Sequence, residues 1–149
     1  MNNTWVATSW LSFDADLSWS KARFTGHDPS GVGDYIPGAV ATTANLGATI
    51  DGLGPWFGAV RLRYFGPRPL IEDNSVKSDS TAITNLRVGY RFDRKTALAL
   101  DVFNLFDRKV SDIDYYYESQ LRGEAAPVND IHSHPAEPRT LRLTLTYRF

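Results

Sequence analysis

The densest group of side chains that could do chemistry lies in the segment from Asp107 to Pro138. Three consecutive tyrosines, Tyr115, Tyr116 and Tyr117, stand there among carboxylates. Aromatic rings supply contact area at low cost in conformational entropy. A connection this long is more often functional than idle. If the chain contacts a small ligand, we expect the contact in this segment, although tyrosines packed on the rim of a fold would look the same.

The same segment holds the candidate metal ligands His132, His134 and Asp130. A spacing of two residues puts both imidazoles on one side of an extended segment, and imidazole and carboxylate are common ligands of transition metals. Histidines at this spacing also occur in loops that bind no metal. The sequence contains no cysteine, which excludes disulfides and thiolate sites. We predict no resident metal or other cofactor.

Signals for catalysis or for nucleic-acid binding are missing. The sequence has no G-x-S-x-G, no P-loop and no H-E-x-x-H motif, and Ser133 between two histidines is no triad. With 16 basic and 17 acidic residues the chain lacks the positive excess typical of nucleic-acid-binding proteins. We therefore predict neither an enzyme nor a nucleic-acid partner.

A second charged group consists of Arg61, Arg63, Arg87 and Arg91, which occupy alternate positions of predicted strands. The same parity carries Asp14, Asp16, Asp51, Asp101, Arg142 and Arg148. Inside a barrel these arginines could form an electropositive lining that helps an anionic ligand to pass. Alternatively they form a hydrated wall with internal ion pairs. Both interpretations place them on the lumenal face.

The elements that must position these residues are strands, because alternation of apolar and polar residues dominates the sequence. Leu143, Leu145, Tyr147 and Phe149 alternate with polar residues at the end of the chain. Six segments follow the pattern: Trp10–Phe24, Val40–Asp51, Trp56–Phe65, Ala82–Phe92, Thr96–Phe106 and Arg139–Phe149. No stretch approaches the length of a transmembrane helix, but strands of this length can cross a bilayer.

The connections alternate between long and short. Gly52–Pro55 and Asp93–Lys95 are short, whereas Thr25–Ala39, Gly66–Thr81 and Asp107–Pro138 are long. Outer-membrane barrels combine short periplasmic turns with long extracellular loops in this way. Aromatic residues at both ends of the strands are typical of the two membrane interfaces. We predict an all-β fold: an antiparallel transmembrane β-barrel wall of six long strands, forming a partial barrel.

Three runs resemble the C-terminal barrel of a TonB-dependent outer-membrane receptor. They are DVFNLFDRK (Asp101–Lys109), EPRTLRLTLTYRF (Glu137–Phe149) and RYFGPRPLIEDNS (Arg63–Ser75). In that family an Asn-Leu-Phe-Asp run closes the penultimate strand, and Pro-Arg leads into a last strand that ends in Phe. The likeness covers the chain from about Trp10 onward.

The resemblance implies a location in the bacterial outer membrane and uptake of a scarce ligand, such as a ferric siderophore, by energy-coupled transport. It also implies a larger plugged barrel and contact with an energy-transducing TonB-type protein through a part outside this chain. We therefore expect residues 1–9 to be the stub of a truncated upstream region and residues 10–149 to be the C-terminal part of the barrel. Met1–Trp10 lacks the features of a signal peptide. Without the plug we expect this segment alone to be inactive.

The end of the chain resembles the signal read by the barrel-assembly machinery. Its members are Leu143, Leu145, Tyr147 and Phe149, which would face the outer-membrane lipid. Two other classes stay open: a small oligomeric structural or adhesive outer-membrane barrel, and a soluble all-β binding protein. The first needs a partner to close the ring, and the second needs the apolar residues to face inward.

Overall fold

The computed structural model describes residues 2–26 and 31–149, and residues 27–30 of the predicted loop Thr25–Ala39 lie outside this range. All the regular elements are strands: β1 (Asn2–Val6), β2 (Leu11–Trp19), β3 (Thr42–Leu53), β4 (Trp56–Phe65), β5 (Thr81–Arg91), β6 (Thr96–Phe103), β7 (Ser111–Ser119), β8 (Val128–Pro135) and β9 (Thr140–Tyr147). Within the described ranges no helix is long and apolar enough to cross a membrane.

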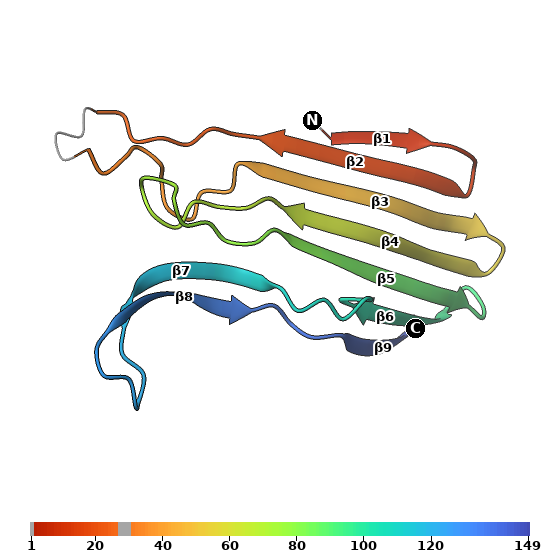
Figure 1. Cartoon of the computed structure of the whole chain (residues 1–149). Helices are drawn as coiled ribbons and strands as arrows, with labels where there is room; N and C mark the ends of the chain where they lie inside the picture. Colours follow the sequence, from red (N-terminus) through yellow and green to blue (C-terminus); the bar gives the residue numbers. More distant parts are fainter. Residues whose placement is uncertain (1, 27–30) are drawn as a thin grey trace.

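Seven strands form one antiparallel sheet in the order β1-β2-β3-β4-β5-β6-β9. The sheet is open, with β1 and β9 at its edges (Figure 1). Strands β7 and β8 form a separate two-stranded ladder. We call the seven-stranded sheet the wall and the β7–β8 ladder the outer hairpin.

All six predicted long strands are present, and three further strands add to them. Strand β1 lies in the segment predicted as a stub and pairs with β2 along its whole length. Strands β7 and β8 lie in the segment predicted as one long loop. Sequence reasoning missed them because β1 is too short to show a period, because three consecutive tyrosines interrupt the alternation in β7, and because β8 is largely polar.

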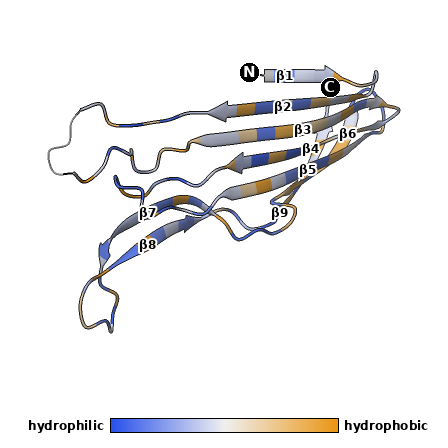
Figure 2. Ribbon diagram, turned by 45° about the horizontal axis from the view of Figure 1, so that its top comes forward, coloured by the Kyte–Doolittle hydropathy of each residue, from blue (hydrophilic) through white to orange (hydrophobic). Residues whose placement is uncertain are grey.

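The register confirms the two predicted faces of the wall. One row across six strands is wholly apolar: Phe13, Ala48, Val60, Leu86, Val102 and Leu141. The next row lies on the opposite face: Ser12, Thr49, Ala59, Arg87, Asp101 and Arg142. Figure 2 shows the alternation as orange and blue along the strands. We call these surfaces the apolar face and the polar face.

The apolar face is exposed rather than packed. Leu143 and Leu145 of β9 are each 68% exposed, and Trp19 of β2 is 73% exposed. A contiguous apolar surface of this extent is rare on proteins that live in water and marks a surface for lipid or protein. On a barrel wall it is the lipid-facing surface.

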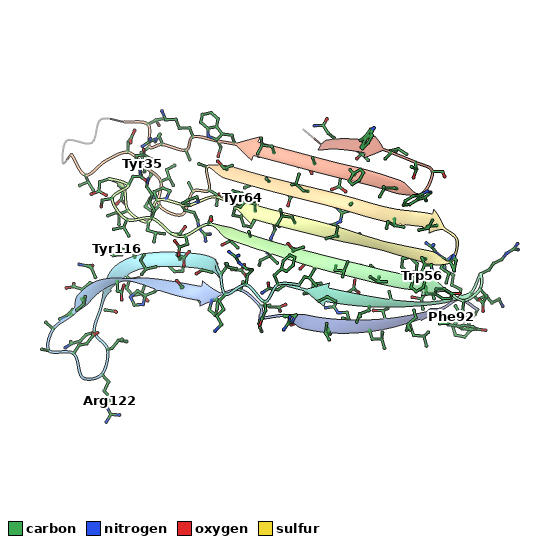
Figure 3. All side chains as sticks on the ribbon, turned by 45° about the vertical axis from the view of Figure 1, so that its right-hand side comes forward. Tyr35, Trp56, Tyr64, Phe92, Tyr116 and Arg122 are labelled. Atoms are coloured by element: carbon green, nitrogen blue, oxygen red, sulfur yellow. The ribbon has the colours of Figure 1, made fainter. Side chains whose placement is uncertain are left out.

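The short connections all lie at one end of the wall and the long ones at the other. The turns after β1, β3 and β5 are short, whereas residues 20–41, 66–80 and 104–139 form the long connections. Aromatic rings gather at the short-turn end, where Tyr90 packs edge-on against Trp56 and Phe92. Figure 3 places Trp56 and Phe92 at this end and Tyr64 at the other end of β4. We call the two ends the short-turn end and the long-loop end.

Most of the buried side chains lie at the long-loop end, whereas Ala99 lies opposite Gly89 in the short-turn half of the wall. Among the described residues the buried hydrophobic ones are Leu70, Ile83 and Ala99. The buried polar ones are Arg68, Ser78, Thr81, Asn104 and Asp114. The polar set lies where the connection from β4 to β5 meets the base of the outer hairpin. This junction positions the candidate site.

Candidate functional site

The outer hairpin continues the last hairpin of the wall. The β6–β9 ladder ends with Phe103 opposite Thr140, and the β7–β8 ladder begins with Ser111 opposite Pro135. Between the ladders seven residues, 104–110, face four residues, 136–139. This unequal interruption separates the hairpin from the wall, so the hairpin's orientation depends on the contacts at the interruption.

Asn104 holds the interruption together. Its backbone lies in the left-handed region with φ of 48°, and its side chain is nearly fully buried. The side-chain amide donates to the carbonyls of Arg108 and Glu137, both at 3.0 Å, and its oxygen accepts from the Arg108 amide. One side chain thereby satisfies backbone groups on both sides of the interruption. Asn is one of the few residues that adopt this conformation readily.

Arg68 fastens the outer hairpin to the connection between β4 and β5. Its Nη2 donates to Asp114 Oδ2 at 3.2 Å and its Nη1 donates to the Asp112 carbonyl at 2.9 Å. Asp114 also accepts a 2.6 Å hydrogen bond from the Ser133 hydroxyl, which joins β7 to β8. Arg68 and Asp114 are both buried, so each charge depends on the other.

The hairpin sorts the three tyrosines onto two faces. Tyr115 and Tyr117 share a face with the two histidines, whereas Tyr116 lies opposite Ile131 on the other face. Tyr117 stacks on His132 with ring centroids 3.9 Å apart, and Tyr115 meets His134 edge-on at 6.2 Å. About half of each of the Tyr115 and Tyr117 side chains is exposed. The predicted contact surface is therefore an aromatic face with alternating Tyr and His.

The metal candidates do not converge. His132 and His134 share one face of β8, as their spacing predicts, but each packs against a tyrosine ring. The Asp130 carboxylate accepts a 2.7 Å hydrogen bond from the Ile131 amide. In residues 2–26 and 31–149 no three His, Cys, Asp or Glu side chains are grouped to hold a metal ion.

The four predicted arginines lie on the polar face, and each has an acidic partner. Arg61 pairs with Asp14 at 2.9 Å, and Arg91 pairs with Asp51 at 2.8 Å. The longer pairs are Arg87–Asp101 at 3.6 Å and Arg63–Asp112 at 4.0 Å. These four arginines thus form ion pairs within the polar face and with the outer hairpin, whereas Arg142 of the same face has no acidic partner within 4.0 Å in the described residues.

The Arg61–Asp14 pair spans two strands because a glycine separates them. Gly47 of β3 lies in register between Asp14 of β2 and Arg61 of β4. A Cβ atom at Gly47 would overlap the Asp14 carboxylate. The glycine therefore leaves the space through which the two charges meet.

A cavity of about 240 Å³ lies on the polar face below the outer hairpin. Its lining includes Arg63, Asn85, Asp112 and Glu137. The cavity lies between the wall and the base of β7. Arg68 and Asn104 were not predicted as site residues, although both lie within the runs that carry the family resemblance.

The last strand places its terminal pattern at an open edge. Leu143, Leu145 and Tyr147 of β9 lie on the apolar face, opposite Leu100, Leu98 and Thr96 of β6. Phe149 follows the strand and packs edge-on against Tyr147 at 5.3 Å. The other side of β9 has no partner strand in the described part of the chain.

Comparisons with known proteins agree with this geometry. A family model described as "TonB dependent receptor-like, beta-barrel" matches residues 2–105. No curated protein sequence matches the chain. Among solved structures, the copper transporter OprC superposes with a TM-score of 0.67 at 20% sequence identity, over 98% of this chain and 23% of that one. At this identity the likeness shows the fold, and the chain spans about a quarter of the transporter's length.

Proposed function

Because the chain belongs to the β-barrel family of TonB-dependent receptors, we propose that it is part of the wall of an outer-membrane receptor that takes up a scarce ligand by energy-coupled transport. The single observation that carries the proposal is the family match over residues 2–105. The wall adds an exposed apolar face and a charged polar face, as a membrane barrel requires.

The rest of the receptor supplies what this segment lacks under the proposal. A plug fills the lumen, the remaining strands close the ring, and a TonB-type protein transmits the energy. Outer-membrane lipid covers the apolar face, and the barrel-assembly machinery reads Leu143, Leu145, Tyr147 and Phe149. We place residues 10–149 at the C-terminal end of that barrel and residues 1–9 at the end of the upstream region.

The direction of the edge strands argues against a ring built from copies of this chain. All neighbouring strands of the wall are antiparallel, and the wall has seven of them. Strands β1 and β9 therefore run in the same direction. Copies inserted in one orientation would need a parallel pair at every junction, whereas bacterial outer-membrane barrels of one chain close with an even number of antiparallel strands.

For the ligand we propose a ferric siderophore, contacted by the face of the outer hairpin that carries Tyr115 and Tyr117. The exposed rings of this face can pack against the apolar or aromatic groups of such a chelate. The structural neighbour OprC is a copper transporter by name, so copper ion is the competing cargo that the experiment must include.

The test is uptake by cells that express the full-length receptor. A radiolabelled ferric catecholate, a ferric hydroxamate and Cu(II) are offered separately, with and without a protonophore. The proposal expects uptake of one ferric chelate that the protonophore abolishes. It also expects about a tenfold weaker affinity when Tyr115 and Tyr117 are both replaced by alanine, because two stacking contacts are lost.

The matched control is Arg122→Gln at the tip of the hairpin (Figure 3), which should leave affinity and uptake unchanged. Uptake that continues after the proton gradient is dissipated would exclude energy coupling. Energy-dependent uptake of Cu(II) without uptake of either ferric chelate would identify copper, and not a ferric siderophore, as the cargo.

A further inference from the structure

The short-turn end of the polar face contains a second cavity, of about 280 Å³, to which the proposed function assigns no ligand. Its lining includes five basic residues: Arg87, Arg91, Arg94, Lys95 and Arg148. They come from the end of β5, the turn into β6 and the residue that follows β9. Three separate segments of the wall thus bring their positive charges to one place.

The floor of this cavity is formed by specific packing between β4 and β5. Phe57 of β4 lies opposite Gly89 of β5, and a Cβ atom at Gly89 would overlap the Phe57 ring. The ring therefore lies flat across the neighbouring strand. Above it, the Arg91 guanidinium lies 4.4 Å from the ring centroid and pairs with Asp51 at 2.8 Å. The stacked ring and the carboxylate together fix the position of the guanidinium.

The charges of this cavity are not balanced. Arg87 and Arg91 have carboxylate partners, but Arg94, Lys95 and Arg148 have no acidic group within 4.0 Å in the described residues. The acids nearby are Asp51, Asp93 and Asp101, which leaves an excess of two positive charges.

The acidic side chain of the turn, Asp93, is hydrogen-bonded to the backbone. The Asp93 carboxylate accepts hydrogen bonds from the backbone amides of Lys95 and Thr96, at 2.6 and 2.8 Å. Those amides lower the pKa of Asp93. Because its oxygen is turned to the backbone, Asp93 pairs with none of the basic side chains.

The polar face is different toward the long-loop end. There Arg61 pairs with Asp14 and Arg63 pairs with Asp112, so each of these arginines has an acidic partner. The unpaired basic side chains around the cavity lie at the short-turn end. A charge gradient along the wall would draw an anion toward the short-turn end.

We propose that this cavity, which we call the basic cavity, binds a small multivalent oxyanion, a polycarboxylate or a phosphate, at the periplasmic end of the lumen. The proposal rests on the proposed function only in placing this cavity in the lumen and at the periplasmic end of the barrel. Arg91 and Arg148 can meet a carboxylate or phosphate oxygen with paired N–H donors. Arg94 and Lys95 sit on the turn and supply two further positive charges.

We take the occupant to be a solute rather than a carboxylate of the receptor itself. Three basic side chains around the cavity have no acidic partner among the described residues, so their charges are available to an added anion. A fixed acidic segment of the receptor would offer the same chemistry, but it would fill the cavity permanently and prevent added anions from binding.

The experiment measures binding of citrate and of inorganic phosphate to the full-length receptor in detergent, by calorimetry at low ionic strength. We expect saturable binding of both anions that weakens as salt is raised, because the site is exposed to screening. The triple variant Arg94→Gln, Lys95→Gln, Arg148→Gln should lose about thirtyfold in affinity, or about threefold for each charge.

Two controls separate loss of the site from loss of the fold. Arg122→Gln removes one positive charge at the far end of the molecule and should leave the affinity unchanged (Figure 3). Arg148→Lys keeps the charge but removes the paired donors, and it should bind more tightly than Arg148→Gln. Each variant is also checked for the heat-modifiable migration of a folded barrel.

Two results would overturn the proposal. One is the absence of citrate and phosphate binding to the wild-type receptor, which would mean that its own acidic groups fill the cavity or that the cavity binds no anion. The other is equal affinity in the wild type and the triple variant. Energy-dependent uptake of the chelate could persist in both cases, so failure here is distinct from failure of the proposed function.

Discussion

The wall and the outer hairpin are both antiparallel ladders, yet different interactions hold them in place. In the wall, each inner strand has a neighbour on both sides, and many of its apolar side chains are exposed on the apolar face. The outer hairpin pairs only with itself. It is fixed by Asn104 at its base and by the buried Arg68–Asp114 pair at its side.

Stability is distributed differently in the two regions. In a membrane, many apolar side chains each contribute a small part of the stability of the wall. Most single positions of the wall should therefore tolerate substitution as long as apolar and polar residues still alternate. The junction depends on a few buried polar groups, and a buried polar group that loses its partner is costly. Single substitutions should therefore act locally and strongly at the junction.

The largest effect is expected from Asp114→Ala. It leaves the buried Arg68 guanidinium unpaired, and breaking a buried pair in this way costs about 3–5 kcal/mol. Hydrogen exchange in the folded receptor should show loss of protection in β7 and β8 with unchanged protection in β3 and β4. The double variant Arg68→Met, Asp114→Leu removes both charges and should restore most of the protection. Unchanged exchange in Asp114→Ala would mean that the pair does not hold the hairpin.

The wall is tested by one charge placed on either face at neighbouring positions of β9. Leu143→Arg puts the charge into lipid and should reduce the free energy of unfolding by about 2–4 kcal/mol. Thr144→Arg puts it on the polar face, where a change below about 1 kcal/mol is expected. Denaturant titration in lipid vesicles measures both. Equal losses would contradict the assignment of the two faces.

Asn104→Ala tests the base of the hairpin. It removes the donor to the Glu137 carbonyl and the acceptor for the Arg108 amide, and the loss should be about 2 kcal/mol. Asn104→Asp keeps the acceptor and should lose less. Protease cleavage within residues 104–110 reports the opening, and equal cleavage of the alanine variant and wild type would contradict the role of Asn104.

The smallest effect concerns Asp93 in a turn of the wall. The amides of Lys95 and Thr96 hold its pKa below the ordinary 3.8. A lowered folded-state pKa gives stability that is present above the unfolded value and is lost as the pH falls through the folded value. Asp93→Asn should therefore lower the unfolding midpoint slightly at pH 7, and the difference should shrink as the pH falls below the ordinary value of 3.8. A difference that does not shrink as the pH falls would contradict this origin.

Much of the wall could be predicted because side-chain direction in a strand alternates locally. Leu141, Leu143 and Leu145 indicate one face whatever the strand pairs with. The long strands, the short turns and the two faces follow from this rule. The same rule failed for β7, because its three consecutive tyrosines interrupt the alternation.

The candidate site could be predicted only in part. Tyr115 and Tyr117 stood out by residue type, and the structure places both on one exposed face. Arg68 and Asn104 did not stand out as site residues, because each acts through hydrogen bonds to residues far away in the sequence. Arg68 lies 46 residues from Asp114, and Asn104 lies 33 residues from Glu137.

The sequence by itself determined the alternation, the exposed apolar face and the family. The tertiary structure decided which charges meet. It paired Arg61, Arg63 and Arg87 of the polar face with acids, left unpaired basic side chains at the short-turn end and placed the hairpin beside Arg68. The physical reason is that alternation is a property of neighbouring residues, whereas the pairing of charges depends on register between strands and on the closure of long loops.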